Sequence, residues 1–531
     1  SDIPDPSLLK DIKISVELFF QTIQSDARIL VVGDYDVDGI TATAILHAVL
    51  RLVDANVDYY VPHRMEEGYG LNVEAIDKLV ADGAEMLITV DCGVSAVEAV
   101  AHATAAGLEV IVTDHHTLGD ELPPASAIVH PSLPDSKYPN VNLAGAGVAF
   151  KLAWQVARAI CGSNRVDAKM RQFLLDATCF AALGTIADVV PLLDENRILV
   201  KYGLRAAERT RRPGLRELRV VAKCDRTALD TQAIAFYLGP RLNVAGRLEK
   251  PDLALELLRT RDVEDARERA TYLHELNRHR QQLEKEGMRE ALTLVTDEDL
   301  ERDRLLCTLG ESWDLGIIGL LASKMSEAYW RPAIAVTDVR RDGLYVGSAR
   351  SIPGYDINDG IVSCREHLVT YGGHAAAAGF SLEADRYEAF RAQLIDHANE
   401  HITPELMQAH LEIDVELAVE DIDMSTVERL RDLEPFGQGN PTPVFCCRGL
   451  EIAALTRVGK EGEHLKLSLR VNGRPRTAMW FRQGERGRHL TIGQSVDVAF
   501  ELSEDTFNGM GVVQMLIRDL DTQAASSQSN S

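Results

Sequence analysis

The sequence predicts a multidomain α/β protein that ends in a small β barrel. Short apolar runs alternate with helical stretches in the first part of the chain, which is typical of βαβ units around a buried parallel sheet. A second α/β region follows, and the last part has short alternating segments split by Gly-, Asn- and Pro-bearing turns. The 531 residues exceed what one hydrophobic core usually supports, so three or four domains are expected.

The first sheet is predicted from five apolar runs between residues 28 and 130. Helices predicted over 40–53, 73–82 and 95–106 separate the first four runs, so their strands should lie parallel. The runs are RILVVG (28–33), VDYYVP (57–62), MLITV (86–90), EVIVT (109–113) and AIVH (127–130).

Helical sequence follows the first sheet. Residues 144–210 carry long apolar helical stretches, and a charged stretch over 263–295 is rich in helix formers, with a single glycine and no proline. The charged stretch could be a helix that connects two lobes. A solvated amphipathic helix within one domain fits the same pattern equally well.

The second half of the chain changes character twice. Strands are predicted at 305–310, 333–337 and 344–350, within an α/β region that extends to about residue 398. A β-rich region then precedes a polar tail that we expect to be disordered. The predicted domains are a first α/β domain with a helical extension (1–262), the connecting helix (263–295), the second α/β domain (296–402), the barrel (403–522) and the tail (523–531).

Composition limits the classes of protein that fit. No apolar run is long enough to span a membrane and the N-terminus shows no secretion signal, so we expect a cytoplasmic protein. The eight cysteines form no CxxC pair, which argues against a zinc ribbon or a disulfide framework. The net charge of −25 argues against a generally basic, nucleic-acid-binding surface, but a local basic channel and bound divalent cations could still serve a polyanion. A monomer is the default expectation.

Carboxylates and imidazoles follow three of the predicted strands, where each strand ends. The carboxyl ends of parallel strands meet at one edge of a sheet, where ligands bind. A single aspartate at such a place could equally be a helix N-cap, and Asp34 fits either role. Three strand ends with the same chemistry favour one shared site. Its candidates are Asp34, Asp36 and Asp38 after the first strand, Asp91 after the third, and Asp114, His115 and His116 after the fourth.

So many clustered carboxylates would repel one another unless cations lie among them. The number of possible ligands suits two divalent ions that share a bridging carboxylate. Mixed Asp oxygen and His nitrogen donors favour Mn²⁺, with Mg²⁺ possible and zinc less suited. Two such ions polarise a phosphate and activate water, so the sequence predicts hydrolysis of a phosphate ester or anhydride.

The motifs DYDVDG (34–39), VDCG (90–93) and TDHH (113–116) resemble those of the DHH phosphoesterase superfamily. GTIADVVPL supplies a fourth acidic motif with Asp188. YVGSARSIPGYDI and YGGHAAAAGF look like the associated DHHA1 domain, and LEPFGQGNPTPVF before a β-rich region looks like an oligonucleotide-binding (OB) barrel. This order of domains is similar to that of the bacterial single-strand-specific exonucleases of the superfamily.

The resemblance implies roles for the acidic residues. Asp91 would bridge two metal ions, Asp34 and Asp114 would lie near the ligands, and His116 would face the substrate phosphate. The implied ligands are Asp36 and Asp91 for one ion, and Asp38, Asp91, His115 and Asp188 for the other.

Other residues are candidates for choosing the substrate. Ser348 and Arg350 fall on one face of a predicted strand, and the resemblance makes them, with Arg64, the grip on a terminal 5′ phosphate. His374 follows a glycine pair at a predicted helix start, where backbone N–H groups could bind phosphate. A tight turn before a small-residue helix is the alternative for this stretch. Arg241, Asn243 and Arg247 complete the set.

The leading hypothesis is a two-metal 5′-to-3′ exonuclease that releases nucleoside 5′-monophosphates from single-stranded DNA in recombination and repair. A helicase and a single-strand-binding protein are the partners this implies. The same chemistry on short oligoribonucleotides, cyclic dinucleotides or polyphosphate is one alternative. A binding protein that keeps the fold without catalysis is the other, although it should have lost metal ligands that are present here.

Overall fold

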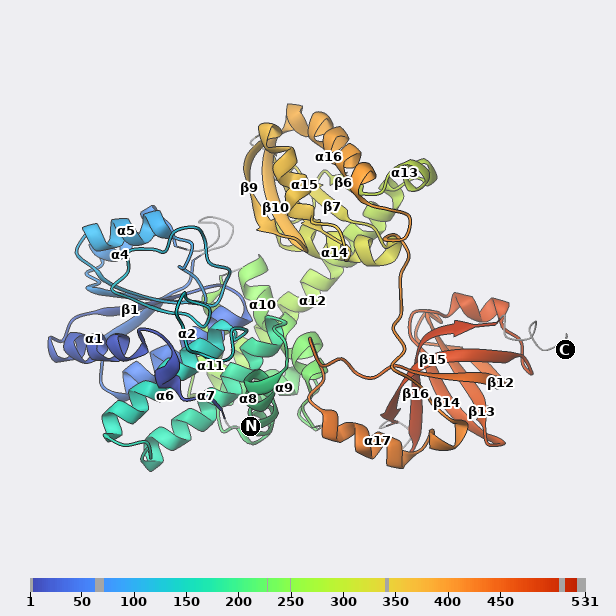
Figure 1. The fold of residues 1–531 in the computed structure, drawn as a ribbon, viewed down its shortest axis with the longest axis horizontal. Coiled ribbons are helices and arrows are strands. Elements are labelled where there is room, and N and C mark those ends of the chain that lie inside the picture. The colour runs from blue at the N-terminus through green and yellow to red at the C-terminus, as the bar shows by residue number, and fades with distance from the viewer. Residues whose placement is uncertain are drawn as a thin grey trace. The chain divides into compact units, whose positions relative to one another are not determined.

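Five parallel strands form the first sheet, in the order β2-β1-β3-β4-β5. The label β1 marks this sheet in the blue part of the chain in Figure 1. The chain leaves β1 for β2 on one side and later returns to β3 on the other side, so the strand order reverses between β1 and β3. Such a reversal opens a crevice at the carboxyl ends of the two strands. All five predicted strands are present: β1 (Ile29–Gly33), β2 (Val57–Tyr60), β3 (Met86–Val90), β4 (Glu109–Thr113) and β5 (Ala127–Val129).

This computed structural model describes residues 3–62, 71–226, 228–248, 250–339, 343–505 and 511–522. Arg64 and the predicted tail at 523–531 lie outside these residues. The chain divides into two compact units, Ser1–Ala409 and His410–Ser531. No helix in the described ranges has the length and apolarity needed to cross a membrane.

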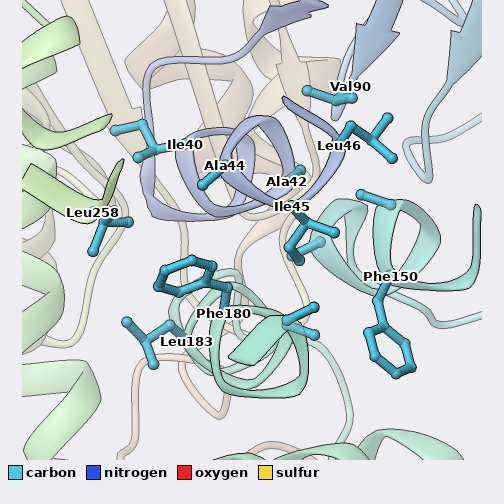
Figure 2. Packing of buried hydrophobic residues seen from close by; sticks show 14 of the residues in the cluster. Ile40, Ala42, Ala44, Ile45, Leu46, Val90, Phe150, Phe180, Leu183 and Leu258 are labelled. Carbon is cyan, nitrogen blue, oxygen red and sulfur yellow. The ribbon is translucent and has the colours of Figure 1, made fainter. Parts of the chain in front are cut away.

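Helix α2 (Val37–Leu52) forms the centre of the first unit and is buried on nearly every side. Ile40, Ile45 and Leu46 point from it in different directions into the surrounding core (Figure 2). The helix begins three residues before the predicted start because the Asp36 side chain caps it. Its neighbours include α6 (Gly145–Cys161), α7 (Ala168–Ala187) and α11 (Asp252–Arg259).

The remaining elements of this part cover the sheet and extend the helical layer. Predicted helices 73–82 and 95–106 correspond to α4 and α5, each within two residues at either end. The elements are η1 (Pro6–Leu8), α1 (Ile12–Gln24), α4 (Val73–Ala81), α5 (Val97–Ala105), α8 (Asp194–Arg209), α9 (Pro213–Val221), the π-helical η2 (Ala233–Leu238) and α10 (Gly239–Leu248).

Helix α12 (Val263–Leu294) connects two hydrophobic cores. Ala266, Ala270 and Leu273 belong to the core around α2, whereas Ala291 near the other end packs with the core around α14 (Leu315–Tyr329). Between the two ends the helix buries an ion pair, Arg280 to Glu284, at 2.6 Å. The prediction of a connecting helix is confirmed.

The second sheet has the order β6-β7-β8-β10-β9, in which only β6 and β7 are parallel. Its helices pack around a second core that includes Phe380 and Phe390. The elements besides α14 are α13 (Asp297–Arg302), β6 (Leu306–Gly310), β7 (Ala333–Thr337), β8 (Leu344–Arg350), α15 (Ile357–Ser363), η3 (Arg365–His367), β9 (Leu368–His374), β10 (Ala377–Glu383), η4 (Ala384–Arg386) and α16 (Tyr387–His401).

The predicted helix start at YGGHAAAAGF is wrong. His374 ends β9 and lies opposite Ala377 of β10, so this stretch is an antiparallel hairpin. Alanine favours a helix locally, but here the backbone of 377–383 pairs with β8 on one side and β9 on the other. Gly347 of β8 makes the pairing possible, because a Cβ there would lie 2.1 Å from the Phe380 ring.

The second unit contains the predicted barrel. Strands β12, β13, β14, β16 and β15 pair in this order, and β15 pairs back to β12 to close the barrel. Trp480 is buried in its core, whereas Phe481 is exposed. The elements are β11 (Val415–Glu416), η5 (Val419–Asp421), α17 (Met424–Leu430), η6 (Arg431–Leu433), β12 (Phe445–Val458), β13 (His464–Val471), β14 (Arg474–Trp480), η7 (Glu485–His489), β15 (Ser495–Glu504) and β16 (Val513–Asp521).

Replacing Ile45 with alanine should lower the free energy of unfolding by about 2–5 kcal/mol, because the side chain is completely buried and its removal leaves a cavity. Denaturant unfolding measures the change. Leu175→Ala is the matched control, since Leu175 lies on α7 and is half exposed, and should change stability by less than about 0.5 kcal/mol. Equal destabilisation by both changes would contradict the central position of α2.

Candidate metal centre

The acidic loop after β1 folds tightly back onto the start of α2. Asp36 accepts hydrogen bonds from the backbone N–H groups of Asp38 and Gly39, at 2.9 and 3.1 Å, through its Oδ1 atom. The N-cap role that the sequence left open for Asp34 therefore falls to Asp36. A Cβ at Gly39 would lie 2.5 Å from the Asp34 carbonyl oxygen, so the loop requires glycine there.

Asp38 is held by the start of a second helix. Its two carboxylate oxygens accept hydrogen bonds from the backbone N–H groups of Gly145 and Ala146 at the N-terminus of α6, at 2.6 and 2.9 Å. The positive end of a helix dipole stabilises a carboxylate at this place. The side chain is completely buried, so protein rather than solvent sets its orientation.

Asp91 and His115 meet at the crevice between β1 and β3. Asp91 has a φ of +61°, a left-handed conformation that is strained for a residue with a Cβ and that recurs at functional sites. Its Oδ1 atom lies 3.0 Å from His115 Nε2. Both atoms are buried, and neither has a hydrogen-bond partner of acceptable geometry in the described part of the chain. Buried polar atoms of this kind indicate a missing ligand such as a metal ion.

Three carboxylates from separate elements surround His115. Besides Asp91, its Nε2 atom lies 3.5 Å from Asp188 Oδ2 and 3.8 Å from Asp38 Oδ2. Asp188 is the C-cap residue of α7, so the fourth acidic motif comes from the helical extension rather than from the sheet. The tertiary structure therefore brings all four motifs to one place.

The donor atoms form three overlapping groups in which every atom lies within 4.8 Å of the others. Two of these groups resemble the ligand sets implied by the sequence, and Asp34 joins the first of them. The groups are Asp34, Asp36 and Asp91; Asp38, His115 and Asp188; and Asp91, His115 and His116. Carboxylate oxygen with one or two imidazole nitrogens suits Mn²⁺ or Mg²⁺.

Crowding of buried carboxylates changes their protonation. Burial, and then the negative charge of Asp36, raise the pKa of Asp38 to about 7. Burial, and then the charge of Asp38, raise the pKa of Asp188 to about 8. Burial also raises the pKa of Asp91 well above its usual range. The carboxylates therefore need a cation to be fully ionised at neutral pH.

Asp114 orients the two histidines. Its Oδ1 atom accepts hydrogen bonds from the backbone N–H groups of His115 and His116 and from His116 Nδ1, and its Oδ2 atom accepts one from the Val94 N–H. Burial lowers the pKa of His116, but the hydrogen bond and charge of Asp114 outweigh burial and raise the pKa to about 9. His116 is therefore a cation at neutral pH.

The structure shows functional glycines that the sequence analysis missed. A Cβ at Gly145 would lie 2.5 Å from Asp91 Oδ1, and a Cβ at Gly184 would lie 2.2 Å from Asp38 Oδ1. Both helices can approach the cluster only without a side chain at these positions. The AGAG and LGT stretches carry a weak signal, because glycine is unfavourable inside a helix unless close packing requires it.

The residues predicted to choose the substrate fall in different places. Asn243 lies at the metal loop, where its Oδ1 atom accepts a hydrogen bond from the Val37 N–H at 2.9 Å. Arg241 instead donates to His274 Nδ1 on α12, at 3.2 Å. His374 is exposed at the end of β9.

Arg247, Ser348 and Arg350 line one cavity of about 460 Å³. Arg350 Nη1 donates to Ser348 Oγ at 3.1 Å, and Arg247 Nη1 donates to the Gly316 carbonyl oxygen at 3.3 Å. Gly319 on α14 leaves the space beside this pair, because a Cβ there would lie 3.0 Å from Arg350 Nη2. Gly319 is another residue that the sequence analysis missed.

Comparisons with known proteins identify the family. Family models match for a DHH family N-terminal domain over residues 28–182, a DHHA1 domain over 303–400 and a RecJ OB domain over 413–519. The single-stranded-DNA-specific exonuclease RecJ of Escherichia coli is 36% identical over 96% of this chain and 90% of its own length. The chain belongs to the RecJ family of single-stranded-DNA-specific exonucleases.

Other RecJ proteins are also similar to this chain, in sequence and in structure. The Bacillus subtilis RecJ is 35% identical over 98% of this chain, which spans 64% of the length of that relative. A crystal structure of Thermus thermophilus RecJ with Mn²⁺ superposes with a TM-score of 0.82 at 32% identity, covering 97% of this chain and 72% of that one. The Mg²⁺ complex of the same protein gives 0.76 at 31% identity, covering 96% and 70%. The predicted fold and metal-dependent hydrolase class are confirmed, and the ions in the two Thermus thermophilus structures are the ones that the sequence of this chain predicts, Mn²⁺ and Mg²⁺.

Gly145→Ala should weaken Mn²⁺ binding at least tenfold, because the new methyl group would displace Asp91 from the cluster. Isothermal titration with Mn²⁺ measures the affinity. Gly147→Ala on the same helix is the matched control, since the nearest atom to its Cβ would be the end of the flexible Leu143 side chain, at 3.2 Å. Similar Mn²⁺ affinities for the two variants would show that the close approach of α6 does not position Asp91.

Mn²⁺ affinity should fall about tenfold or more when the pH is lowered from 8 to 6. The raised pKa values of Asp38 and Asp188 mean that these groups hold protons in the metal-free protein below pH 7 to 8, and an ion must displace them. Titrations in buffers of different ionisation enthalpy also count the released protons. An affinity that is constant over this pH range would contradict the coupling.

Proposed function

We propose that this protein is a 5′-to-3′ exonuclease that hydrolyses single-stranded DNA to nucleoside 5′-monophosphates with two divalent ions. The observation that carries the proposal is the position of His115 Nε2, within 3.8 Å of carboxylate oxygens from Asp38, Asp91 and Asp188. Four separate chain segments build this centre, in a chain whose RecJ relatives are named as single-stranded-DNA-specific exonucleases.

Asp91 would bridge the two ions because it shares a donor group with Asp34 and Asp36, and its Oδ1 atom also lies 3.0 Å from His115 Nε2, which shares another group with Asp38 and Asp188. The proposed ligands are Asp36 and Asp91 for one ion, with Asp34 in reach, and Asp38, Asp91, His115 and Asp188 for the other. Bound there, the ions would polarise the scissile phosphate and supply hydroxide near neutral pH.

His116 is proposed to contact the phosphate that is cut. The hydrogen bond and charge of Asp114 raise its pKa and so favour the protonated imidazole, which suits a phosphate oxygen on which charge develops during the reaction. Asp114 is a positioning residue rather than a ligand, because it belongs to none of the three donor groups and its Oδ1 atom holds the backbone of His115 and the ring of His116. Asn243 is likewise a positioning residue, since it fixes the first turn of α2 beside Asp36.

The cavity lined by Arg247, Ser348 and Arg350 is proposed to hold the 5′ phosphate. A planar guanidinium with a neighbouring hydroxyl offers several donors to phosphate oxygens. A pocket for the chain end would explain exonucleolytic cleavage from the 5′ end. On the basis of the sequence alone, Arg64 is also proposed to bind the 5′ phosphate. Arg241 and His374 are proposed to lie along the path of the strand.

Beyond the catalytic parts, the barrel is proposed to bind the single strand. Phe481 is exposed at the end of β14, where a base could stack on it. We also propose that the enzyme acts in recombination and repair, and that a helicase and a single-strand-binding protein deliver its substrate. A cytoplasmic monomer is consistent with these roles.

End-labelled product analysis tests the function. With Mn²⁺ or Mg²⁺, a 5′-phosphorylated single strand should give mononucleotides from the 5′ end, and a duplex should resist. Asp91→Ala should lower turnover at least 10³-fold by removing the bridging ligand, while its far-UV spectrum stays unchanged. Cleavage of dinucleotides but not of long strands would favour the alternative with short substrates, and strand binding without release of mononucleotides would favour a non-catalytic protein.

Arg350→Ala should reduce kcat/KM on 5′-phosphorylated strands about 10- to 100-fold, because charge-assisted hydrogen bonds to the phosphate are lost. Strands with a 5′ hydroxyl should be cut nearly as well as by the unchanged protein. Arg365→Ala provides a matched control, since Arg365 is exposed in the same domain outside the cavity. Equal losses on phosphorylated and unphosphorylated ends would reject the 5′-phosphate role.

A further inference from the structure

A second cavity, of about 470 Å³, lies at the opposite end of α2 from the metal centre. It is formed between the C-terminal end of α2, the first half of α7 and the C-terminal end of α11. Arg51 at its edge lies about 20 Å along the helix from Asp38, at a rise of about 1.5 Å per residue. The cavity is therefore separate from the site where the strand is proposed to be cut.

Five cationic side chains line this cavity, together with one carboxylate, Asp176. The carboxylate pairs with Arg212 at 3.2 Å. None of the other four cations forms an ion pair with a carboxylate within the described residues. These four are Arg51, Lys169, Arg259 and Arg261. In a chain with a net charge of −25, such a concentration of positive charge favours an anionic ligand.

Arg259 is held in place without neutralisation of its charge. Its guanidinium lies 4.3 Å from the centroid of the Tyr59 ring, and its Nη2 atom donates to His47 Nε2 at 3.1 Å. Burial, and then the charge of Arg259, lower the pKa of His47 to about 4, so His47 is neutral and accepts this hydrogen bond. The guanidinium is thus positioned by two neutral groups, and its interaction with the nearby Asp252 carboxylate falls short of an ion pair within the described residues.

The same cavity has apolar walls. Phe173, Phe180 and Leu258 are buried beside the cationic groups, and Arg212 covers one face of the Phe180 ring at 5.6 Å. A volume of about 470 Å³ exceeds what an inorganic phosphate needs and lies within the usual range for small-molecule sites. Cations at the rim and an apolar interior match a molecule with a charged end and a flat, weakly polar end.

We propose that this cavity binds a nucleoside phosphate, with its phosphate groups on Arg51, Arg259 and Arg261 and its base against the apolar wall. A concave site with a buried floor suits a small ligand better than a continuous strand. This inference goes beyond the proposed function, because nothing in strand hydrolysis requires a nucleotide at this end of α2. The nucleotide could be the mononucleotide product or a di- or triphosphate.

Binding by the full-length chain tests the proposal. Isothermal titration in EDTA at about 0.15 M salt keeps nucleotides from the metal centre and screens unspecific attraction. AMP, ADP and ATP should bind saturably, inorganic phosphate more weakly, and adenosine not measurably. The order of the three nucleotide affinities distinguishes a product site from a site for a polyphosphate. Absence of saturable nucleotide binding would overturn the proposal.

Variants place the binding in the cavity. Arg51→Ala and Arg261→Ala should each weaken nucleotide binding about tenfold, since both side chains are exposed at the rim and their loss leaves the core intact. Arg171→Ala is the matched control, because Arg171 is exposed on α7 but does not line the cavity. Equal affinities in all three variants would refute the location.

Two further measurements separate this inference from the proposed function. The double variant Arg51→Ala, Arg261→Ala should cleave saturating single strands at the rate of the unchanged protein. Nucleotide binding in EDTA would stand even if no strand cleavage were found. Displacement of a bound nucleotide by a single strand with a 5′ hydroxyl, at equal nucleotide concentration, would assign the cavity to the strand and overturn the proposal.

Discussion

Mutual repulsion among buried carboxylates is the constraint on which the rest of this structure depends. Asp38, Asp91 and Asp188 converge on His115 in a crevice from which water is largely excluded, and such a cluster is stable in its ionised form only with cations. The surrounding elements hold the carboxylates in this arrangement: α6 offers its N-terminus to Asp38, and Asp91 takes a strained backbone conformation. The strained backbone at Asp91 costs free energy of folding, and this cost keeps its carboxylate in position to bind a metal ion.

Helix α2 connects the acidic cluster to the hydrophobic core of the first unit. It begins in the acidic loop, is buried along its length, and ends beside a cationic cavity. Because the surrounding helices pack against it from several directions, the donors at its N-terminus cannot shift without disturbing the core (Figure 2). One rigid element therefore supports two sites of opposite charge.

Much of the fold could be predicted from the sequence, and the exceptions have local causes. Strands 28–33, 86–90 and 109–113 were recognisable because buried parallel strands are continuously apolar. The prediction of a helix start at YGGHAAAAGF is wrong, because alanine favours a helix locally and one of the two pairing partners, β8, lies more than twenty residues earlier in the chain. The place of Asp34 also stayed open until the structure assigned the cap to Asp36.

The sequence by itself determined which chemical groups the site contains, since acidic residues after strands of a parallel sheet must gather at one edge. Only the tertiary structure decided which of them meet. It brings Asp188 from the end of α7 to the cluster and places Arg247 with Ser348 in one cavity. It also shows that Gly145 and Gly184 leave no room for a side chain beside the carboxylates. Contacts between segments far apart in the chain depend on packing in three dimensions, whereas the apolar pattern of a segment indicates its own local structure and not its partner.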